Sequence, residues 1–194
     1  QEYDKEEILN ERKISDELRV SRSAVREALK ALEAEDWVEY IPYKGIVVKK
    51  MTEADLKNIF QIRRALELLA VEIAVPNLTA KNIKDLEACY EIQKNMLVKP
   101  ENQLFMEMDV KFHGILLEAT DNKILIKMIS DIRDKIRRFG MNAIFSGSHR
   151  YVETVEEHEE ILKAIKSNDV DLAKQAMHTH MNNTYERAHD YIIS

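Results

Sequence analysis

Residues that end helices and form tight turns are scarce in this chain, and this strongly constrains its fold. Only 4 glycines and 3 prolines occur among 194 residues, too few for the many turns of an all-β protein. Hydrophobic residues make up 45% of the chain and charged residues 33%, which is ordinary for a globular protein. We therefore predict a mainly α-helical protein, built as one large domain or two small ones.

From Thr52 onward the sequence predicts six helices and little else. Thr52 and Asp55 have the spacing of a capping box at the start of the first helix. The expected helices cover residues 53–75, 79–97, 102–119, 122–145, 149–167 and 169–191. Breaks between them are expected at Pro76, Asn77, Pro100, Asn168 and Asp169. About 140 residues of antiparallel helices can bury one core, so an all-α bundle is predicted over residues 53–194.

The N-terminal part, residues 1–50, has a different pattern. Ser21 is expected to cap a helix in which Val25, Leu29 and Leu32 share one side. A shorter helix precedes it, with Ser15 as its expected cap and Ile14 and Leu18 as its apolar contacts. Two short helices in close succession, with arginines at the start of the second, predict a helix-turn-helix.

Two β-like runs follow this helix pair, at residues 37–41 and 46–48. They are joined by residues 42–45, where Gly45 can take the positive φ of a hairpin turn and Lys44 is expected at the tip. A hairpin after a helix-turn-helix predicts a winged helix. A small α+β module with solvated arginines is the alternative interpretation of the same residues.

Charge is unevenly distributed along the chain, whose formal net charge is −6. Residues 19–30 contain four basic residues and a single acid, Glu27, and a second basic group consists of Lys44, Lys49 and Lys50. Nucleic-acid binding requires positive charge where contact is made rather than over the whole protein. We therefore expect the helix that starts at Arg22 to enter the DNA major groove, with Arg22 and Arg26 reaching guanine edges or phosphates.

Four residues of the helical part could ligate a metal ion. Asp109 and His113 are four residues apart and project from one face of a helix. His158 lies beside Ile161, Leu162 and Ile165 and is expected to point inward. His180 lies one turn from Met177 and Ala176. Inward ligands from several helices of a bundle can converge on one ion, and three His with one Asp suit Zn²⁺, Ni²⁺ or Mn²⁺.

Each of these residues also has a simpler interpretation. A histidine on an apolar helix face can be a hydrogen-bonded core residue, and Asp109 could be a surface charge. His149, His178 and His189 are expected to lie away from the candidate site. Four glutamates are expected to form a solvated face, namely Glu156, Glu157, Glu159 and Glu160.

Other features bear on the cellular setting. The single cysteine, Cys89, cannot form an internal disulfide, which favours a reducing cytosol. No apolar run approaches the roughly 20 residues that span a bilayer. The chain starts with Gln1 rather than Met, so we expect further sequence to precede it.

The sequence resembles GntR-family transcription regulators of the FadR branch, whose C-terminal ligand-binding domain is called FCD. In the N-terminal part the matching residues are Glu11-Arg12, ISDEL (14–18), VSR (20–22), VREAL (25–29) and Gly45. In the C-terminal part they are RRALE (63–67), DVKFH (109–113), NKIL (122–125), HEEILKAI (158–165) and residues 169–180. Six helices rather than seven resemble the shorter, VanR-like form of the FCD domain.

The resemblance implies functional residues at both ends of the chain. It implies operator contacts by Arg12, Arg22, Arg26 and Gly45. With the neighbouring residues, the expected DNA-binding set is Arg12, Ser21, Ser23, Arg22, Arg26, Lys44 and Gly45. It also implies that Asp109, His113, His158 and His180 hold a divalent ion, next to which a small carboxylate effector binds. Arg63 and Arg137 are the candidates for holding the far end of that effector.

The chain departs from the family pattern in three places. Family members start with a further helix, so the winged helix in residues 1–50 is expected to be incomplete. Arg19 replaces a small residue and could add a phosphate contact, and Ala24 replaces a common proline. Neither change blocks DNA contact, but both leave the operator sequence unpredicted.

The leading hypothesis is a cytoplasmic, metabolite-responsive repressor that binds a palindromic operator as a homodimer, with the FCD domain supplying the dimer contact and the sensor. We expect it not to be an enzyme. One alternative is a metal-dependent hydrolase or lyase on a helical bundle, but no general base stands out and the DNA-binding module would have no role. Another is a metal sensor with no organic effector.

Overall fold

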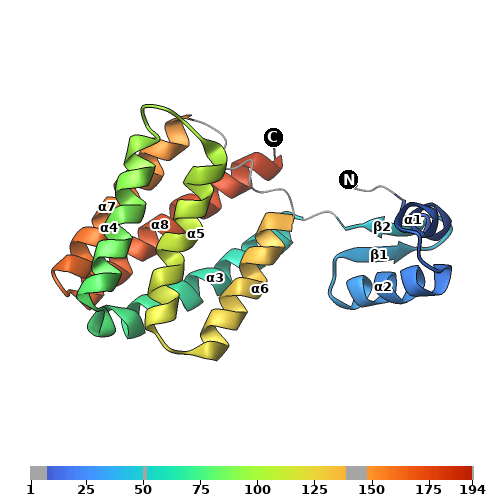
Figure 1. Cartoon of the computed structure of the whole chain (residues 1–194), viewed down its shortest axis with the longest axis horizontal. Coiled ribbons are helices and arrows are strands. Elements are labelled where there is room, and N and C mark those ends of the chain that lie inside the picture. The colour runs from blue at the N-terminus through green and yellow to red at the C-terminus, as the bar shows by residue number, and fades with distance from the viewer. Residues whose placement is uncertain (1–7, 50–51, 139–147, 194) are drawn as a thin grey trace. The chain divides into compact units, whose positions relative to one another are not determined.

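The computed structural model describes residues 8–49, 52–138 and 148–193, and the chain divides into two units (Figure 1). The first unit is Gln1–Met51 and the second is Thr52–Ser194. Each unit buries its own hydrophobic cluster. The predicted class, a winged helix followed by an all-α bundle, is confirmed.

The first unit contains two helices and a hairpin. Its elements are α1 (Glu11–Leu18), α2 (Arg22–Ala34), β1 (Val38–Ile41) and β2 (Gly45–Val48). The strands pair antiparallel, with Val38 opposite Val48 and Ile41 opposite Gly45. Gly45 has φ +103°, as the hairpin required. The core of this unit consists of Leu9, Ile14, Val25, Leu29 and Val38.

The start of α1 differs from the prediction. Asn10, not Ser15, caps this helix, because its side chain accepts hydrogen bonds from the backbone N–H groups of Arg12 and Lys13 at 2.9 and 3.1 Å. Ser15 is buried inside the helix and donates its hydroxyl to the Val20 carbonyl at 2.8 Å. Leu18 is 66% exposed rather than an apolar contact. Apolar contact comes instead from Leu9, which precedes the cap.

The cap of α2 is as predicted. The Ser21 side chain accepts a hydrogen bond from the Ala24 backbone N–H at 3.2 Å. Val25 and Leu29 are buried on the inner side of the helix, and Leu32 packs against the same core. The outer side of α2 therefore remains open to solvent.

The second unit contains six α-helices within its described residues. They are α3 (Glu53–Ala74), α4 (Ala80–Asn95), α5 (Asn102–Ala119), α6 (Lys123–Arg138), α7 (Ser148–Lys166) and α8 (Val170–Ile193), and a 3₁₀ turn, η1 (Val75–Asn77), follows α3. These bounds agree closely with the predicted helices. The predicted extension of α6 to residue 145 lies outside the described residues from position 139 onward.

Capping residues determine where several of these helices start. Thr52 and Asp55 form the predicted capping box at the start of α3. Asn168 has φ 55° and follows the end of α7. At the start of α8, the Asp169 side chain accepts a hydrogen bond from the Leu172 backbone N–H at 2.9 Å. No helix among the described residues combines the length and the apolar character needed to cross a bilayer.

Packing of the bundle brings five helices around one interior. Helix α8 packs against both α3 and α7, and α4 packs against α5 and α7. Figure 1 shows α4 and α5 in front of α7 and α8, with α3 crossing beneath α5. Most of the interior is apolar, but α3, α4, α5, α7 and α8 each bury polar residues there.

Candidate metal centre

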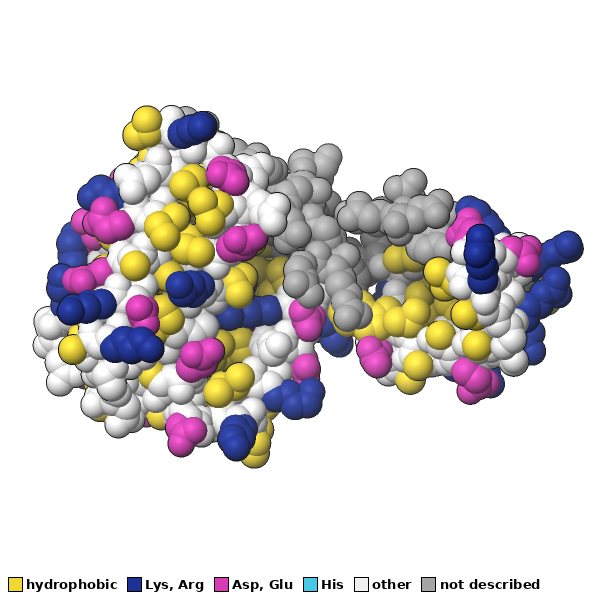
Figure 2. Space-filling view, viewed as in Figure 1, with side chains coloured by type: hydrophobic (Ala, Val, Ile, Leu, Met, Phe, Trp, Pro, Cys, Tyr) yellow, Lys and Arg dark blue, Asp and Glu magenta, His cyan; other side chains and the backbone are white. Residues whose placement is uncertain are grey.

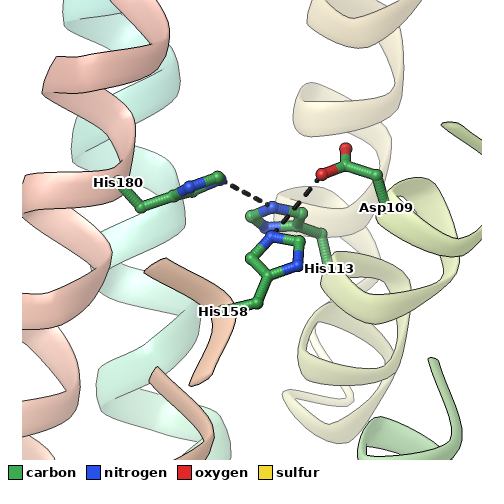
Figure 3. Close-up of side chains that lie close together, drawn as sticks. All are labelled: Asp109, His113, His158 and His180. Atoms are coloured by element: carbon green, nitrogen blue, oxygen red, sulfur yellow. Dashed lines mark hydrogen bonds and ion pairs between the residues drawn. The ribbon is translucent and has the colours of Figure 1, made fainter. Parts of the chain in front are cut away.

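The structure brings the four predicted metal ligands together. Asp109 and His113 lie one turn apart on α5, His158 lies on α7 and His180 lies on α8 (Figure 3). All four are buried, and one potential ligand atom from each lies within 4.8 Å of the others. The interpretation of Asp109 as a surface charge is wrong, since this residue is only 6% exposed.

Distances within this cluster suit a shared cation. The Nε2 atoms of His113 and His180 are 3.1 Å apart, and His158 Nε2 is 3.5 Å from Asp109 Oδ1. Two ligand atoms that bind one Zn²⁺ at about 2.0–2.2 Å lie about 3–3.5 Å from each other. Asp109 Oδ1 and His158 Nε2 are both buried without a hydrogen-bond partner. The donor set and its unsatisfied atoms therefore fit a divalent metal ion.

Each imidazole is oriented by a side chain outside the cluster. His158 Nδ1 lies 2.7 Å from Gln93 Oε1, and His180 Nδ1 lies 2.7 Å from Glu157 Oε2. His113 Nδ1 lies 3.5 Å from Glu67 Oε2.

All three partners are acceptor oxygens, so the proton of each neutral imidazole belongs on Nδ1. The Nε2 lone pairs then face one another and the Asp109 carboxylate. A buried arrangement of lone pairs and negative charge is unfavourable unless a cation lies among them.

The ionisation states agree with this arrangement. Burial lowers the pKa of His158 well below its usual value, and burial likewise lowers the pKa of His180. Burial alone would raise the pKa of Asp109, but the three histidines and Arg63 outweigh it and lower that pKa. Neutral imidazoles and an ionised carboxylate are the forms that bind metal ions.

Glu67 was not identified from the sequence, although it links the cluster to two arginines. Its carboxylate is 1% exposed, accepts a hydrogen bond from Arg133 Nη2 at 3.1 Å and lies 3.6 Å from Arg63 Nε. Burial by itself raises the pKa of Glu67, but His113, Arg133 and Arg63 lower it strongly. The i, i+4 spacing of Arg63 and Glu67 on one helix was the signal that could have revealed this pair.

Glu157 corrects the prediction of a solvated glutamate face on α7. Its side chain is 9% exposed and receives two hydrogen bonds from Arg187, each 3.1 Å long. Burial raises its pKa, whereas the hydrogen bonds from His180 and Arg187 lower it to about 2. Glu156 and Glu160 are exposed as predicted.

The two effector candidates have different outcomes. Arg63 is 6% exposed, and its Nε is buried without a hydrogen-bond partner. Arg137 lies on α6, and its side chain is outside the part of the structure that is described. A further unsatisfied group, Thr154 Oγ1, is fully buried on α7, one turn from His158 on the same helix face.

The predicted DNA-binding residues lie on the surface of the first unit. Arg12, Arg22, Ser23, Arg26 and Lys44 are exposed, Ser21 caps α2, and Gly45 is half-buried in β2. Arg26 Nε and Nη2 donate to the two carboxylate oxygens of Glu11 at 3.0 and 2.8 Å. The hydrogen bond from Arg26 lowers the pKa of Glu11. This pair holds the Arg26 guanidinium between α1 and α2.

Basic side chains gather at one end of the first unit. Figure 2 shows Lys and Arg concentrated around the end where Figure 1 places α1 and the β1–β2 turn. A winged helix with such an end, joined to a helical bundle with a buried polar cluster, defines a DNA-binding regulator with a separate second domain.

Comparisons with known proteins identify the family. Residues 1–48 match the model described as bacterial regulatory proteins, gntR family, and residues 58–183 match the FCD domain. The chain therefore belongs to the GntR family of transcription regulators and carries an FCD domain.

Two curated relatives are similar along most of their length. The chain is 30% identical to the Uxu operon regulator of Haemophilus influenzae over 92% of this chain and 72% of that protein. It is 28% identical to the gluconate operon transcriptional repressor of Bacillus subtilis over 96% of this chain and 78% of that protein. These relatives are regulators and not enzymes, which confirms that prediction.

Solved structures share the fold. McbR/YncC of Escherichia coli has a TM-score of 0.78 at 22% identity, covering 97% of this chain and 89% of that one. The metal-free FCD domain of TM0439 has a TM-score of 0.60 at 19% identity, covering 74% of this chain and 97% of that one.

Proposed function

We propose that this regulator represses transcription as a homodimer on a palindromic operator, and that its FCD domain binds a divalent cation with a small carboxylate effector. The convergence of Asp109 with three buried histidines carries the metal part of this proposal. The relative from Bacillus subtilis is named as a repressor of the gluconate operon, and gluconate is a small hydroxylated carboxylate. That name supports both repression and the effector class.

The ion would be held by Asp109, His113, His158 and His180. Zn²⁺ is the leading candidate for three nitrogen ligands and one oxygen, and Ni²⁺ or Mn²⁺ also suits them. When bound, the ion supplies positive charge and coordination positions that a carboxylate oxygen can occupy. The surrounding residues Glu67, Gln93 and Glu157 hold the imidazoles in the tautomer that binds metal.

Two unsatisfied groups near the centre support an organic effector over a metal sensor. Arg63 Nε can donate to an anion, and the Thr154 hydroxyl can bind a polar group of the same molecule. Buried groups of this kind are costly unless a partner satisfies them. We assign Arg63 to effector binding on this ground, and Arg137 from its position on α6.

In the first unit, α2 would enter the major groove with Arg22 and Arg26 directed at bases or phosphates. The other proposed contacts are Arg12, Ser21, Ser23, Lys44 and Gly45. One such helix reads only a few base pairs, so useful specificity requires two copies on a palindromic site.

The test uses the purified protein and a duplex selected from randomised DNA. Elemental analysis and mass spectrometry identify the bound ion and any co-purified molecule. Operator retardation is then measured in chelator, after adding Zn²⁺, and after adding Zn²⁺ with gluconate. A response only to the last addition supports the proposal, a full response to Zn²⁺ alone indicates a metal sensor, and protein that binds no metal contradicts the centre.

A further inference from the structure

The turn at the tip of the hairpin contains a residue that its conformation does not favour. The Lys44 backbone N–H donates to the Ile41 carbonyl at 3.1 Å, which closes a four-residue turn with Pro42 second and Tyr43 third. Tyr43 has φ +66°. Proline followed by a positive φ is the pattern of a type II turn, whose third position is normally Gly or Asn.

A tyrosine at this position costs stability to the fold. Its Cβ crowds the backbone in the left-handed region, so bulky residues are rare there. Burial of the ring could compensate for this cost, but the Tyr43 side chain is fully exposed, at 107% relative exposure. No other exposed large hydrophobic residue in the described part of the chain reaches that value. Packing within the hairpin therefore does not explain why a tyrosine ring occupies this position.

The position of the turn indicates what the ring contacts. The chain passes from the end of α2 into β1, which runs back beside α2, so the turn lies at the end of the unit where α2 starts (Figure 1). Lys44, next in sequence, is exposed, and basic side chains surround this end (Figure 2). A partner that meets the start of α2 and Lys44 together is a polyanion, which favours DNA over an apolar protein surface.

We propose that Tyr43 is a DNA-binding residue that places its ring against the sugar and base edges of the groove beside the wing. The rigid turn, with Pro42 on one side and Gly45 on the other, presents the ring before DNA binds. Its hydroxyl can donate to a phosphate or base acceptor. This inference rests on the proposed operator binding and adds to it a contact that carries no charge.

The experiment compares variants of the full chain on the duplex that the wild-type protein enriches from randomised DNA. Tyr43→Gly and Tyr43→Asn both accept a positive φ and remove the ring. Each is expected to weaken binding about tenfold, the size of an aromatic contact to a base. The thermal unfolding midpoint should stay the same or rise, because the strained position is relieved.

Two controls separate this contact from other effects. Lys44→Ala should lower the slope of log affinity against log salt by about one, whereas both Tyr43 variants should leave that slope unchanged. Tyr40→Ala removes an exposed tyrosine from a regular strand position of the same hairpin and should change affinity less than about twofold, since it lies outside the strained turn.

Three outcomes would overturn the inference. They are full affinity in both Tyr43 variants, an equal loss in Tyr40→Ala, or a loss that accompanies a lower unfolding midpoint. If wild-type protein enriches no duplex at all, operator binding itself fails, and that result is distinct from the other three.

Discussion

In the winged helix the side chains proposed to bind a partner are exposed, whereas in the helical bundle those proposed to bind a ligand are buried. Arg22 and Lys44 face solvent and contribute little to folding. His158 and Glu67 are almost completely buried and have to be satisfied by the fold or by a ligand. Substitutions of these residues in the first unit should therefore weaken binding without changing the stability of the fold. Those in the second unit should change both binding and stability.

The largest effect is expected at the cluster of buried histidines. Replacing His158 and His180 together with Ala should abolish tight Zn²⁺ binding, measured by calorimetry and elemental analysis, because two of four ligands are lost. His178→Ala is the matched control, since His178 lies exposed on the same helix as His180. Unchanged metal content in the double variant would show that the ligand set is wrong.

The next effect sharpens the contrast between buried and exposed ion pairs. Glu67→Gln should lower the free energy of unfolding by about 3 kcal/mol or more, because Arg63 and Arg133 lose a buried anion. Asp131→Asn breaks the exposed pair with Lys127 on α6 and should cause no measurable change. Urea denaturation of both variants measures the difference, and similar values for the two would contradict it.

In the winged helix, replacing both Arg22 and Arg26 with Ala should weaken specific operator binding about 100-fold, as expected for two lost base contacts. The urea midpoint should change little, since both side chains are exposed. Titration by fluorescence anisotropy measures the affinity. Specific binding that survives the double substitution would mean that α2 is not the recognition helix.

A last prediction is a pH dependence of the metal-free protein. In the unfolded chain His158 and His180 take up protons below about pH 6.5, whereas burial lowers the pKa of both in the folded protein, that of His158 strongly. The unfolded state therefore binds more protons at acidic pH, so the free energy of unfolding is highest above about pH 6.5 and decreases below it, by at most about 1.4 kcal/mol per pH unit for each histidine.

Urea denaturation in chelator between about pH 7.5 and 5 measures this dependence, since that range brackets the pKa of an unfolded histidine. The His158 and His180 double variant should have a weaker dependence, and His178→Ala should leave it unchanged. A pH dependence that is the same in all three proteins would show that the buried histidines do not cause it.

Local patterns in the sequence were sufficient for most of the secondary structure. The apolar side of α2, the capping box at Thr52 and the positive φ of Gly45 each depend on neighbouring residues only. The cap of α1 was predicted wrongly because both Asn10 and Ser15 are good capping residues. Which one caps depends on Ile14, which packs into a core formed with Val38 from the hairpin.

By itself, the sequence determined the helices, the hairpin and the four candidate ligands, because helical spacing and side-chain chemistry are local properties. Only the tertiary structure brought His158 and His180 to within reach of α5 and supplied Glu67, Gln93 and Glu157 as their partners. These contacts join residues far apart in the chain, so helix packing decides them. Tyr43 differs from these residues, because its turn involves only neighbouring residues. The strain in that turn could nevertheless be recognised only once the φ angle and the exposure of Tyr43 were known.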